Sequence, residues 1–314
     1  MSATIFFEPL DVLFLRGNKL FGDPGSHGEA LMPPWPSVVA GALRSRMLVD
    51  AGIDPAAFAR GQVPHTELGT PSHPGPFIIS AFHLARRFSD GRVELVLAPP
   101  ADLVVTEDKC GKPVVHRLRP TEPKEGLLCS SPTRQLAVLP EGRRSKPAGG
   151  FWLNEAGWRE YLAGNVPSST HLLRTEVLWR YDHRVGVGLD AARRRAAEGR
   201  LFSLQAVVPV KREHRIGGKP ADYDTGFLAQ VSGANPPRDG LVRFGGDGRA
   251  AVLHPVTQPL PEPDYESIAR AGCCRLVLTT PGIFEQGWRP PGCKPQGDGS
   301  YLFELAGVRA RLVC

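Results

Sequence analysis

Apolar and polar positions follow patterns that predict a chain of short strands with few helices. The segments 3–15, 77–88 and 92–97 are rich in apolar and β-branched residues, as half-buried strands are. The tetrapeptide SDGR joins the last two, and Asp-Gly between strand-like runs is a strong hairpin signal. A second hairpin is predicted for 101–119.

One helix stands out in the first half. After Pro36, the segment 37–50 places Val39 and Leu43 on one helix face. Arg44 lies about 140° around the helix from Val39, so it should face solvent or a partner. The order strand, long loop, helix and antiparallel strands fits a ferredoxin-like β-α-β-β unit.

The second half repeats this style. Residues 120–150, with Arg143, Arg144 and Lys146, are polar and Pro/Gly-rich and are interpreted as a loop or inter-domain linker. Beyond them the patterns predict a short helix after Asn154, a helix over 263–271, a final hairpin over 301–314, and strands over 171–181, 201–210, 241–244, 250–253 and 274–280.

Composition adds an excess of arginine to this picture. The chain has 314 residues, which suggests two domains at roughly 150 residues each. Its net charge is +6, with 30 arginines against 8 lysines, and the stretch 174–249 alone carries 14 basic and 9 acidic residues. Arginine forks suit phosphate groups, although a GC-rich genome that writes Arg for Lys would give the same count.

Several classes of function leave no trace in the sequence. There is no G-x-S-x-G, no C-x-x-C, no P-loop and no His pair at metal-binding spacing, so no catalytic triad, metal or cofactor is expected. The pair Asp222 and Asp224 is interpreted as a turn. No apolar run approaches the ~20 residues of a membrane span, and no secretory signal is visible. The six cysteines fit a reducing cytoplasm.

Two glycine-rich segments beside arginines are the candidate phosphate contacts. VGVGLD follows Arg184, and FGGDG precedes Arg249. Glycines let a phosphate approach backbone N–H groups, and arginine adds a bidentate grip. The glycines in question are Gly186, Gly188, Gly245, Gly246 and Gly248. A simple tight turn is the alternative, slightly favoured for the second segment and disfavoured for the first.

The triplet Arg193–Arg195 is the densest positive charge. On a helix the three side chains would fan out by about 100° each, whereas in a loop they could follow a phosphate backbone. Both alternatives stay open. The aromatic stripe of an RNA-recognition motif is missing, so RNA would be held mainly through its backbone and shape.

These segments form four ordered blocks that carry a family resemblance. The blocks are FEPLDVLFLRGNKLF with PPWPSVVAGALRS, then YDHRVGVGLDAARRRAAEGRLFSLQAV, VRFGGDGRAA and LVLTTPGIFEQGWRP, from residue 7 to about 290. In this order they resemble the RAMP-superfamily subunit of the type III-B CRISPR effector (the Cmr complex) that binds the 5′ handle of the crRNA.

The resemblance implies an α+β fold of two ferredoxin-like (RRM-like) domains with long Gly/Pro-rich loops, which we place at 1–165 and 166–314. It implies a non-catalytic subunit that binds crRNA, the large palm-domain subunit and a neighbouring backbone RAMP subunit. Asp182 departs from the family, whose acidic residue is adjacent to the arginine. Members also continue to a further strand, so the last strand of the second domain is expected to be missing, truncated or rearranged.

The candidate RNA contacts are basic residues of the first long loop, the helix and the second half. They are Arg16, Lys19, His27, Arg44, Arg184, Arg193, Arg194, Arg195 and Arg249. One rival hypothesis is a metal-independent endoribonuclease that processes precursor crRNA, with His27 or His183 as general acid or base. Another is a protein–protein spacer whose loops bind subunits and not RNA.

Overall fold

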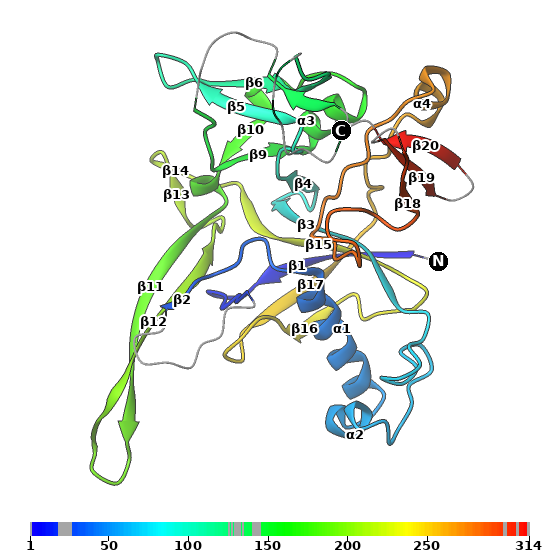
Figure 1. Ribbon diagram of the computed structural model, residues 1–314. Coiled ribbons are helices and arrows are strands. Elements are labelled where there is room, and N and C mark those ends of the chain that lie inside the picture. Colours follow the sequence, from blue (N-terminus) through cyan, green and yellow to red (C-terminus); the bar gives the residue numbers. More distant parts are fainter. Residues whose placement is uncertain are drawn as a thin grey trace. The chain divides into compact units, whose positions relative to one another are not determined.

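The computed structural model forms two compact units, each built from two stretches of chain (Figure 1). The structure describes residues 2–17, 27–124, 126, 128, 133, 135–139, 146–297, 300–305 and 308–312. Unit 1 comprises Met1–Leu97 and Leu173–Pro261, and unit 2 comprises Ala98–Leu172 and Glu262–Cys314. These units differ from the consecutive halves 1–165 and 166–314, because strands from both halves pair within unit 1.

Unit 1 is built mainly from strands. Its elements are β1 (Ser2–Pro9), β2 (His27–Gly28), α1 (Pro36–Asp50), α2 (Pro55–Ala59), β3 (Ile78–Phe88), β4 (Val93–Leu97), η2 (Thr175–Val177), β11 (Trp179–Asp190), β12 (Arg195–Pro209), β13 (Arg215–Ile216), β14 (Lys219–Pro220), β15 (Tyr223–Ser232), β16 (Gly240–Arg243) and β17 (Ala250–Val256). The short strand β10 (Leu172–Arg174) lies at the boundary of the units.

The main sheet of unit 1 has the order β4-β3-β15-β1-β17-β16. Every neighbouring pair in it is antiparallel. Strand β1 lies between β15 and β17, with Phe7 opposite Phe227 on one side and Leu253 on the other. Among the described strands, the first strand of the chain is therefore paired only with ones that follow it by more than 200 residues.

Phenylalanine rings fill one face of this sheet. Phe7, Phe227 and Phe244 are fully buried. The ring centroid of Phe244 lies 5.5 Å from that of Phe7 and 5.3 Å from that of Phe227. Phe82 stacks on Phe227 at 5.7 Å. Because side chains alternate along a strand, Glu8, which follows Phe7, lies on the opposite face of the sheet. The residues aligned with Glu8 on neighbouring strands lie on that face too.

Helix α1 confirms the helix predicted after Pro36. Proline occupies its first position, where the missing N–H costs nothing. Val39, Leu43 and Met47 are buried, and α1 contacts β3 and β16. The same periodicity leaves Arg44 exposed, as predicted.

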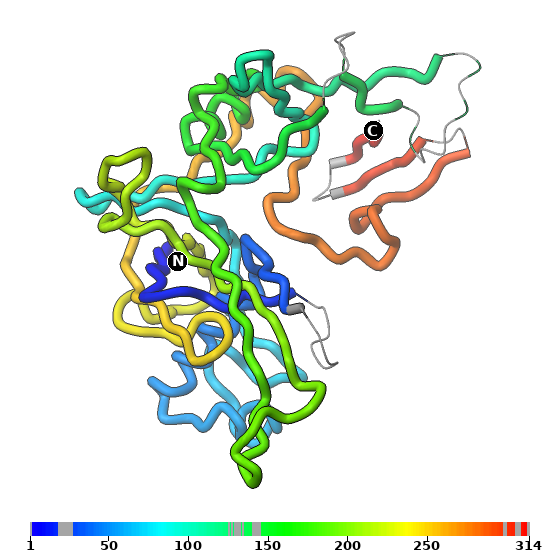
Figure 2. The backbone as a smooth tube through the Cα atoms, turned by 90° about the vertical axis from the view of Figure 1, so that its left-hand side faces the viewer, coloured from blue at the N-terminus to red at the C-terminus, as the bar shows by residue number. Residues whose placement is uncertain are grey.

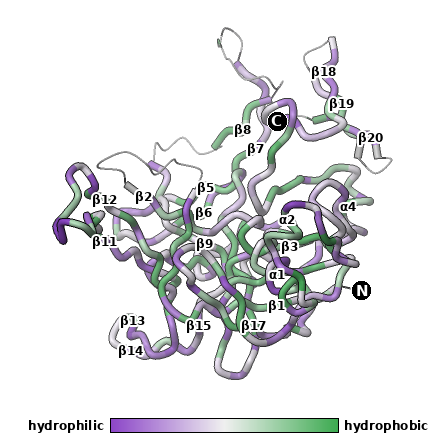
Figure 3. The backbone as a smooth tube through the Cα atoms, turned by 90° about the horizontal axis from the view of Figure 1, so that it is seen from below, coloured by the Kyte–Doolittle hydropathy of each residue, from purple (hydrophilic) through white to green (hydrophobic). Residues whose placement is uncertain are grey.

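Strands β11 and β12 form a long antiparallel hairpin, called the arm below, which leads away from the main sheet (Figure 2). Near its base, Leu13 bridges to Val207, which ties the arm to the chain after β1. The two-residue strand β2 pairs with β12 in parallel, through His27 opposite Ser203. The tip is coloured hydrophilic in Figure 3, in contrast to β1.

Unit 2 contains short hairpins and small helices. Its elements are β5 (Leu103–Glu107), β6 (Pro113–Arg117), β7 (Arg119–Thr121), β8 (Leu136–Val138), β9 (Phe151–Asn154), α3 (Glu155–Leu162), η1 (Ser169–His171), α4 (Tyr265–Ala271), β18 (Cys293–Pro295), β19 (Tyr301–Leu305) and β20 (Val308–Leu312). Asn154 caps α3 by accepting a hydrogen bond from Gly157 N at 3.0 Å. This is the predicted helix after Asn154.

An ion cluster holds the pieces of unit 2 together. Tyr161 donates a hydrogen bond to Asp102 Oδ1 at 2.8 Å, and Arg275 Nε lies 3.2 Å from Asp102 Oδ2. Burial and this hydrogen bond raise the pKa of Tyr161. Arg117 donates to the carbonyls of Gly164 and Asn165. The two stretches of unit 2 are thus joined through one carboxylate.

The structure confirms an α+β fold of mostly antiparallel strands with few helices. The predicted hairpins at 77–97, 101–119 and 301–314 are confirmed in the described residues. Within the predicted linker, β7 pairs with β8. Arg143 and Arg144 of its basic patch lie outside the described residues.

Five predictions differ from the structure. The strand predicted for 171–181 is interrupted by η2 between β10 and β11. Asp224, interpreted as part of a turn, lies in β15, where it pairs with Arg212. The segment 274–280 is not a strand, because no described strand pairs with it despite its β-forming residues. The strand predicted for 3–15 ends at Pro9, beyond which only the isolated bridges of Leu13 and Arg16 continue the pairing. VGVGLD is extended within β11 and is not a turn.

Candidate nucleic-acid interface

The ring of Phe14 brings two predicted arginines together. The guanidinium carbon of Arg184 lies 5.6 Å from its centroid, and that of Arg249 lies 5.2 Å away. Arg184 comes from β11 and Arg249 from the loop between β16 and β17. A cation within about 6 Å of an aromatic face is attracted by the ring quadrupole, by ~0.5–1 kcal/mol at exposed sites. Arg184, Arg249 and Phe14 are called the Phe14 cluster below.

The glycines before Arg249 seat its loop on the backbone of Phe14. Gly246 N donates to the Phe14 carbonyl at 2.8 Å. Gly245 has φ +82°, and a Cβ there would lie 3.1 Å from the same oxygen. Gly248, at φ +66°, has open space around it. Of the three, only Gly248 has the open surroundings that the phosphate-approach interpretation needs.

Nearby carboxylates partly neutralise both arginines of the cluster. Arg249 Nη1 lies 2.7 Å from Asp11 Oδ2, and its Nη2 lies 3.6 Å from Asp247 Oδ2. Arg184 Nε lies 2.8 Å from Asp182 Oδ2. The Arg184 side chain is nevertheless 42% exposed, so part of its fork is open to a ligand. The two-residue spacing from Asp182 places the acid and the arginine on one strand face.

A cavity of about 420 Å³ lies beside the Phe14 cluster. Its lining is mostly apolar, with a few polar groups, as is usual for ligand sites. The lining residues are Phe14, Leu15, Arg16, Gly28, Glu29, Phe202, Leu204, Gln205 and Asp247. Gln205 Oε1 accepts a hydrogen bond from Ala30 N at 3.2 Å, which fixes the orientation of that amide.

The other candidates from the first half do not gather at one place. Arg16 lines this cavity and bridges to Ala30. Arg44 lies over the ring of Phe77 at 5.1 Å and not over Phe14. Lys19 and the side chain of His27 lie outside the described residues.

A second cavity of about 370 Å³ lies between α1 and the glycine loop. Small residues line much of it. The lining residues are Phe14, Leu15, Ser37, Val38, Gly41, Ala42, Ser45, Arg243, Gly245 and Gly246. Phe14 and Leu15 thus lie between the two cavities, with the glycine loop on one side.

The arginine triplet occupies the tip of the arm. Asp190 Oδ1 accepts hydrogen bonds from Ala192 N and Arg193 N, each at 3.1 Å, and so closes the turn. Arg194 has φ +50°, and Arg195 opens β12 opposite Asp190. All three arginines are exposed. The loop alternative is therefore the correct one, and the solvated helix is excluded.

The two glycines of β11 are explained by packing across the arm. Gly186 lies opposite Phe202, and a Cβ on Gly186 would overlap that ring. A Cβ on Gly188 would lie 2.9 Å from the Arg200 side chain. Both glycines make room for a cross-strand neighbour, so the space that a phosphate would need is already occupied.

Sequence reasoning missed the aromatic centre of this surface. Phe14, Phe202 and Asp11 were not singled out, although Phe14 lies two residues before Arg16. No local signal pairs Phe14 with Arg184 or Arg249, because the contacts depend on sheet register over more than 160 residues. Within the described residues, no group of three His, Cys, Asp or Glu could hold a metal ion. No helix in the described part is long and apolar enough to cross a membrane.

Comparison with known proteins places the chain in a family. The model of the CRISPR-associated protein family Cas_Cmr3 matches residues 5–314. The chain belongs to the Cas_Cmr3 family. This confirms the predicted relationship to a Cmr subunit, at the level of the family. No curated protein matches the sequence.

Two solved structures are similar to this chain. One is a chain of the type III-B Cmr-β complex bound to cognate target RNA and AMPPnP, with a TM-score of 0.41 and 12% identity over 82% of this chain. The other is from the same kind of complex bound to cognate target RNA, with a TM-score of 0.38 and 12% identity over 82% of this chain. The Cas_Cmr3 chain spans 63% and 64% of their lengths.

Proposed function

We propose that this Cas_Cmr3 protein is a non-catalytic subunit of a type III-B CRISPR effector that binds the 5′ handle of the crRNA in the cytoplasm. The observation that carries the proposal is the Phe14 cluster, where Arg184 and Arg249 lie over one ring beside a cavity. Guanidinium groups bind phosphate in a bidentate way, and aromatic rings stack on unpaired bases. Both kinds of contact suit a single-stranded RNA end.

The cavity beside Phe14 is the proposed seat of one unstacked base. Phe14 and Phe202 supply aromatic surface, and Gln205 supplies a polar group of fixed orientation. Arg184 and Arg249, which lie over the Phe14 ring but do not line the cavity, would then hold the adjoining phosphates. The tip of the arm would add a further electrostatic contact through Arg193, Arg194 and Arg195.

The order of the strands supports a ferredoxin-like origin for unit 1. Strands β17, β1, β15 and β3 lie side by side in that order, and α1 lies in the connection between β1 and β3. This is the fourth-first-third-second arrangement of a ferredoxin-like unit, with β16 in the place of its second helix. The arm and the first stretch of unit 2 are inserted between its second and third strands.

The arrangement of β11 argues against the ribonuclease hypothesis. His183 and Arg184 are neighbours in one strand, so their side chains lie on opposite faces of the arm. A general acid or base at His183 would therefore be separated from the Arg184 fork. The proposal is accordingly that bond cleavage belongs to other subunits.

The proposed protein partners are the large palm-domain subunit and a neighbouring backbone RAMP subunit. One face of the arm is aliphatic and exposed, with Val185 at 74% and Leu189 at 72%. Val187 and Leu201 lie opposite each other on that same face. The aliphatic part of this face suits a protein surface better than RNA, because base stacking needs aromatic rings, and the rings on this face, Tyr181 and His183, lie nearer the base of the arm. This observation favours a combined role in RNA binding and scaffolding.

The proposal is tested by removing both arginines of the Phe14 cluster. The variant Arg184→Gln with Arg249→Gln should bind a crRNA handle at least about tenfold more weakly. Its salt slope should fall by about 1.4, or about 0.7 per phosphate on a single strand. Fluorescence anisotropy titrations at several salt concentrations measure both quantities.

The matched control for this test is Arg159→Gln. Arg159 is an exposed arginine on α3, with a side chain 56% exposed, and it is paired with Glu155 at 2.7 Å as Arg184 is paired with Asp182 at 2.8 Å. It should keep the affinity and the salt slope of the wild type. A wild-type affinity and slope in the double variant would contradict the proposed interface.

A further inference from the structure

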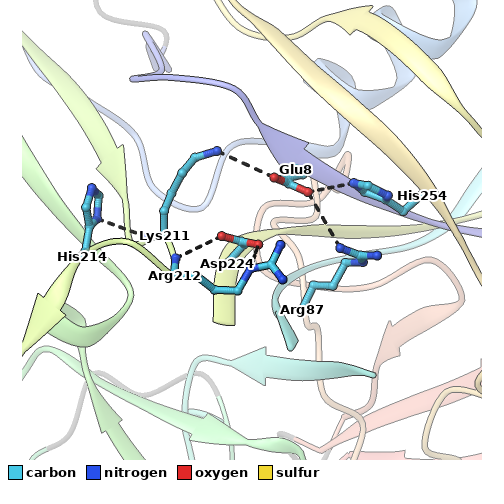
Figure 4. A network of polar contacts seen from close by, with 7 residues as sticks. All are labelled: Glu8, Arg87, Lys211, Arg212, His214, Asp224 and His254. Atoms are coloured by element: carbon cyan, nitrogen blue, oxygen red, sulfur yellow. Dashed lines mark hydrogen bonds and ion pairs between the residues drawn. The ribbon is translucent and has the colours of Figure 1, made fainter. Parts of the chain in front are cut away.

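A second cationic cluster surrounds Glu8 on the sheet face opposite the phenylalanine rings (Figure 4). His254 Nε2 lies 2.7 Å from Glu8 Oε2. Lys211 Nζ lies 3.8 Å from Glu8 Oε1, and Arg87 Nη1 lies 4.0 Å from Oε2. We call Glu8, Arg87, Lys211 and His254 the Glu8 cluster.

Four separate parts of unit 1 supply the Glu8 cluster. Glu8 lies on β1, Arg87 on β3, His254 on β17, and Lys211 just after β12. The sheet register fixes three of them, since β1 pairs directly with β17 and β3 is joined to β1 through β15. Their side chains are 16–26% exposed, so the charges are partly desolvated and still reachable.

A neighbouring arginine, Arg212, has a carboxylate partner at hydrogen-bond distance, whereas Arg87 and Lys211 do not. Arg212 Nε lies 2.7 Å from Asp224 Oδ2, and Arg212 N donates to Asp224 Oδ1 at 3.1 Å. Asp224 is only 4% exposed, and its carboxylate is already paired with Arg212. Arg87 and Lys211, in contrast, approach Glu8 at distances longer than a hydrogen bond.

The charges of the Glu8 cluster do not cancel. Arg87 and Lys211 carry two positive charges, and Glu8 supplies one negative charge. Within the described chain, neither cation reaches another carboxylate. His83, also on β3, adds no charge near neutral pH, because burial lowers its pKa to about 4. One positive charge therefore remains in excess in a partly desolvated place, which favours an anion.

We propose that the Glu8 cluster binds one phosphate of the RNA chain, with Arg87 and Lys211 as the contacts and Glu8 as the group that holds them in position. A phosphodiester carries one negative charge, so its binding would bring the cluster to neutrality. The hydrogen bond from His254 keeps one oxygen of Glu8 turned toward β17. The inference rests on the proposed function, since it assumes that this chain binds RNA.

Replacing the cations and replacing Glu8 should change RNA binding in opposite directions. Lys211→Gln and Arg87→Gln should each lower the salt slope of binding by about 0.7 and weaken binding several-fold. Glu8→Gln should strengthen binding several-fold, because the carboxylate that competes with the phosphate is removed. A purely structural network would instead give no change in slope for any of them.

The experiment uses the full chain and a fluorescein-labelled crRNA handle, titrated at several salt concentrations. Arg212→Gln is the matched control, because its cation is already paired with Asp224; it should keep the wild-type slope even where its melting temperature falls. Lys211→Arg keeps the charge and should keep the slope. Melting curves for every variant establish that the chain is folded during the titration.

The outcomes separate this inference from the proposed function. If the wild type binds and Lys211→Gln, Arg87→Gln and Glu8→Gln all bind like it, the phosphate site is wrong and the proposed function stands. If the three variants shift with the predicted signs, the site is supported. If the wild-type chain does not bind the RNA, both are overturned.

Discussion

The surroundings of each arginine decide how much of its charge a ligand can use. Arg212 is closed by a buried carboxylate, whereas Arg184 shares an exposed one. In the described chain, the guanidinium groups of the tip arginines come no closer than 3.8 Å to a carboxylate. Counting arginines therefore draws attention to the stretch 174–249, but only the partners of each side chain separate the paired arginines from those that are open to a ligand.

The contacts of the glycines next to these arginines likewise decide what each glycine does. From the sequence, Gly186 and Gly245 had the same interpretation as places where a phosphate approaches the backbone. The structure assigns Gly186 to the Phe202 ring and Gly245 to the backbone of Phe14. Neither contact could be predicted locally, because each depends on a residue at least 16 positions away.

Gly186→Ala tests this packing interpretation. The new methyl group would overlap the Phe202 ring, so the free energy of unfolding should fall by about 1–3 kcal/mol. Adding Phe202→Ala to Gly186→Ala should restore part of the lost free energy of unfolding, because the ring that causes the overlap is then absent. Urea unfolding of the two variants measures both effects. A Gly186→Ala variant of wild-type stability that binds RNA poorly would instead support the phosphate-approach interpretation.

Among the elements, the arm is the one whose shape suggests a function. A two-stranded hairpin is marginally stable by itself in water, and this one leaves an aliphatic face exposed. Its strands were predicted only in part, because Val185 to Asp190 contains two glycines that favour a turn in isolation. Pairing with β12 on both sides of a register shift at Gly188 overrides that preference.

Replacing the three tip arginines with glutamine should separate binding from folding. The combined variant of Arg193, Arg194 and Arg195 should lose about 2 from the salt slope of RNA binding, at about 0.7 per contact. Its melting temperature should not change, because the side chains are exposed and Asp190 holds the turn through backbone N–H groups. An unchanged slope would show that the tip does not touch the RNA.

For the molecule as a whole, local hairpins were predictable and the sheet was not. The Asp-Gly of SDGR predicted the hairpin of β3 with β4, and the turn at 108–111 between two apolar runs predicted that of β5 with β6. The pairing of β1 with β15 and β17 joins residues more than 200 positions apart, and no pattern in one sequence specifies it. The Phe14 and Glu8 clusters both depend on that pairing, which is why only Arg184 and Arg249 of the first cluster, and no residue of the second, were among the predicted contacts.

The prediction for 274–280 was wrong in the opposite direction, because it placed a strand where the structure has none. The residues of this segment favour a strand, but a strand needs a neighbour, and the described part of unit 2 pairs none with it. Leu276 and Leu278 remain about two-thirds exposed there. Propensity alone therefore overestimated the regular structure of unit 2.

The most direct test of the account is a binding measurement with the wild-type chain. A labelled crRNA with its 5′ handle is compared in EDTA with an RNA of equal length whose handle sequence is replaced, and the same samples are run on a denaturing gel. We expect at least about tenfold tighter binding of the handle RNA, with the RNA intact. Equal affinity for the two RNAs, or cleavage of either one, would contradict this expectation.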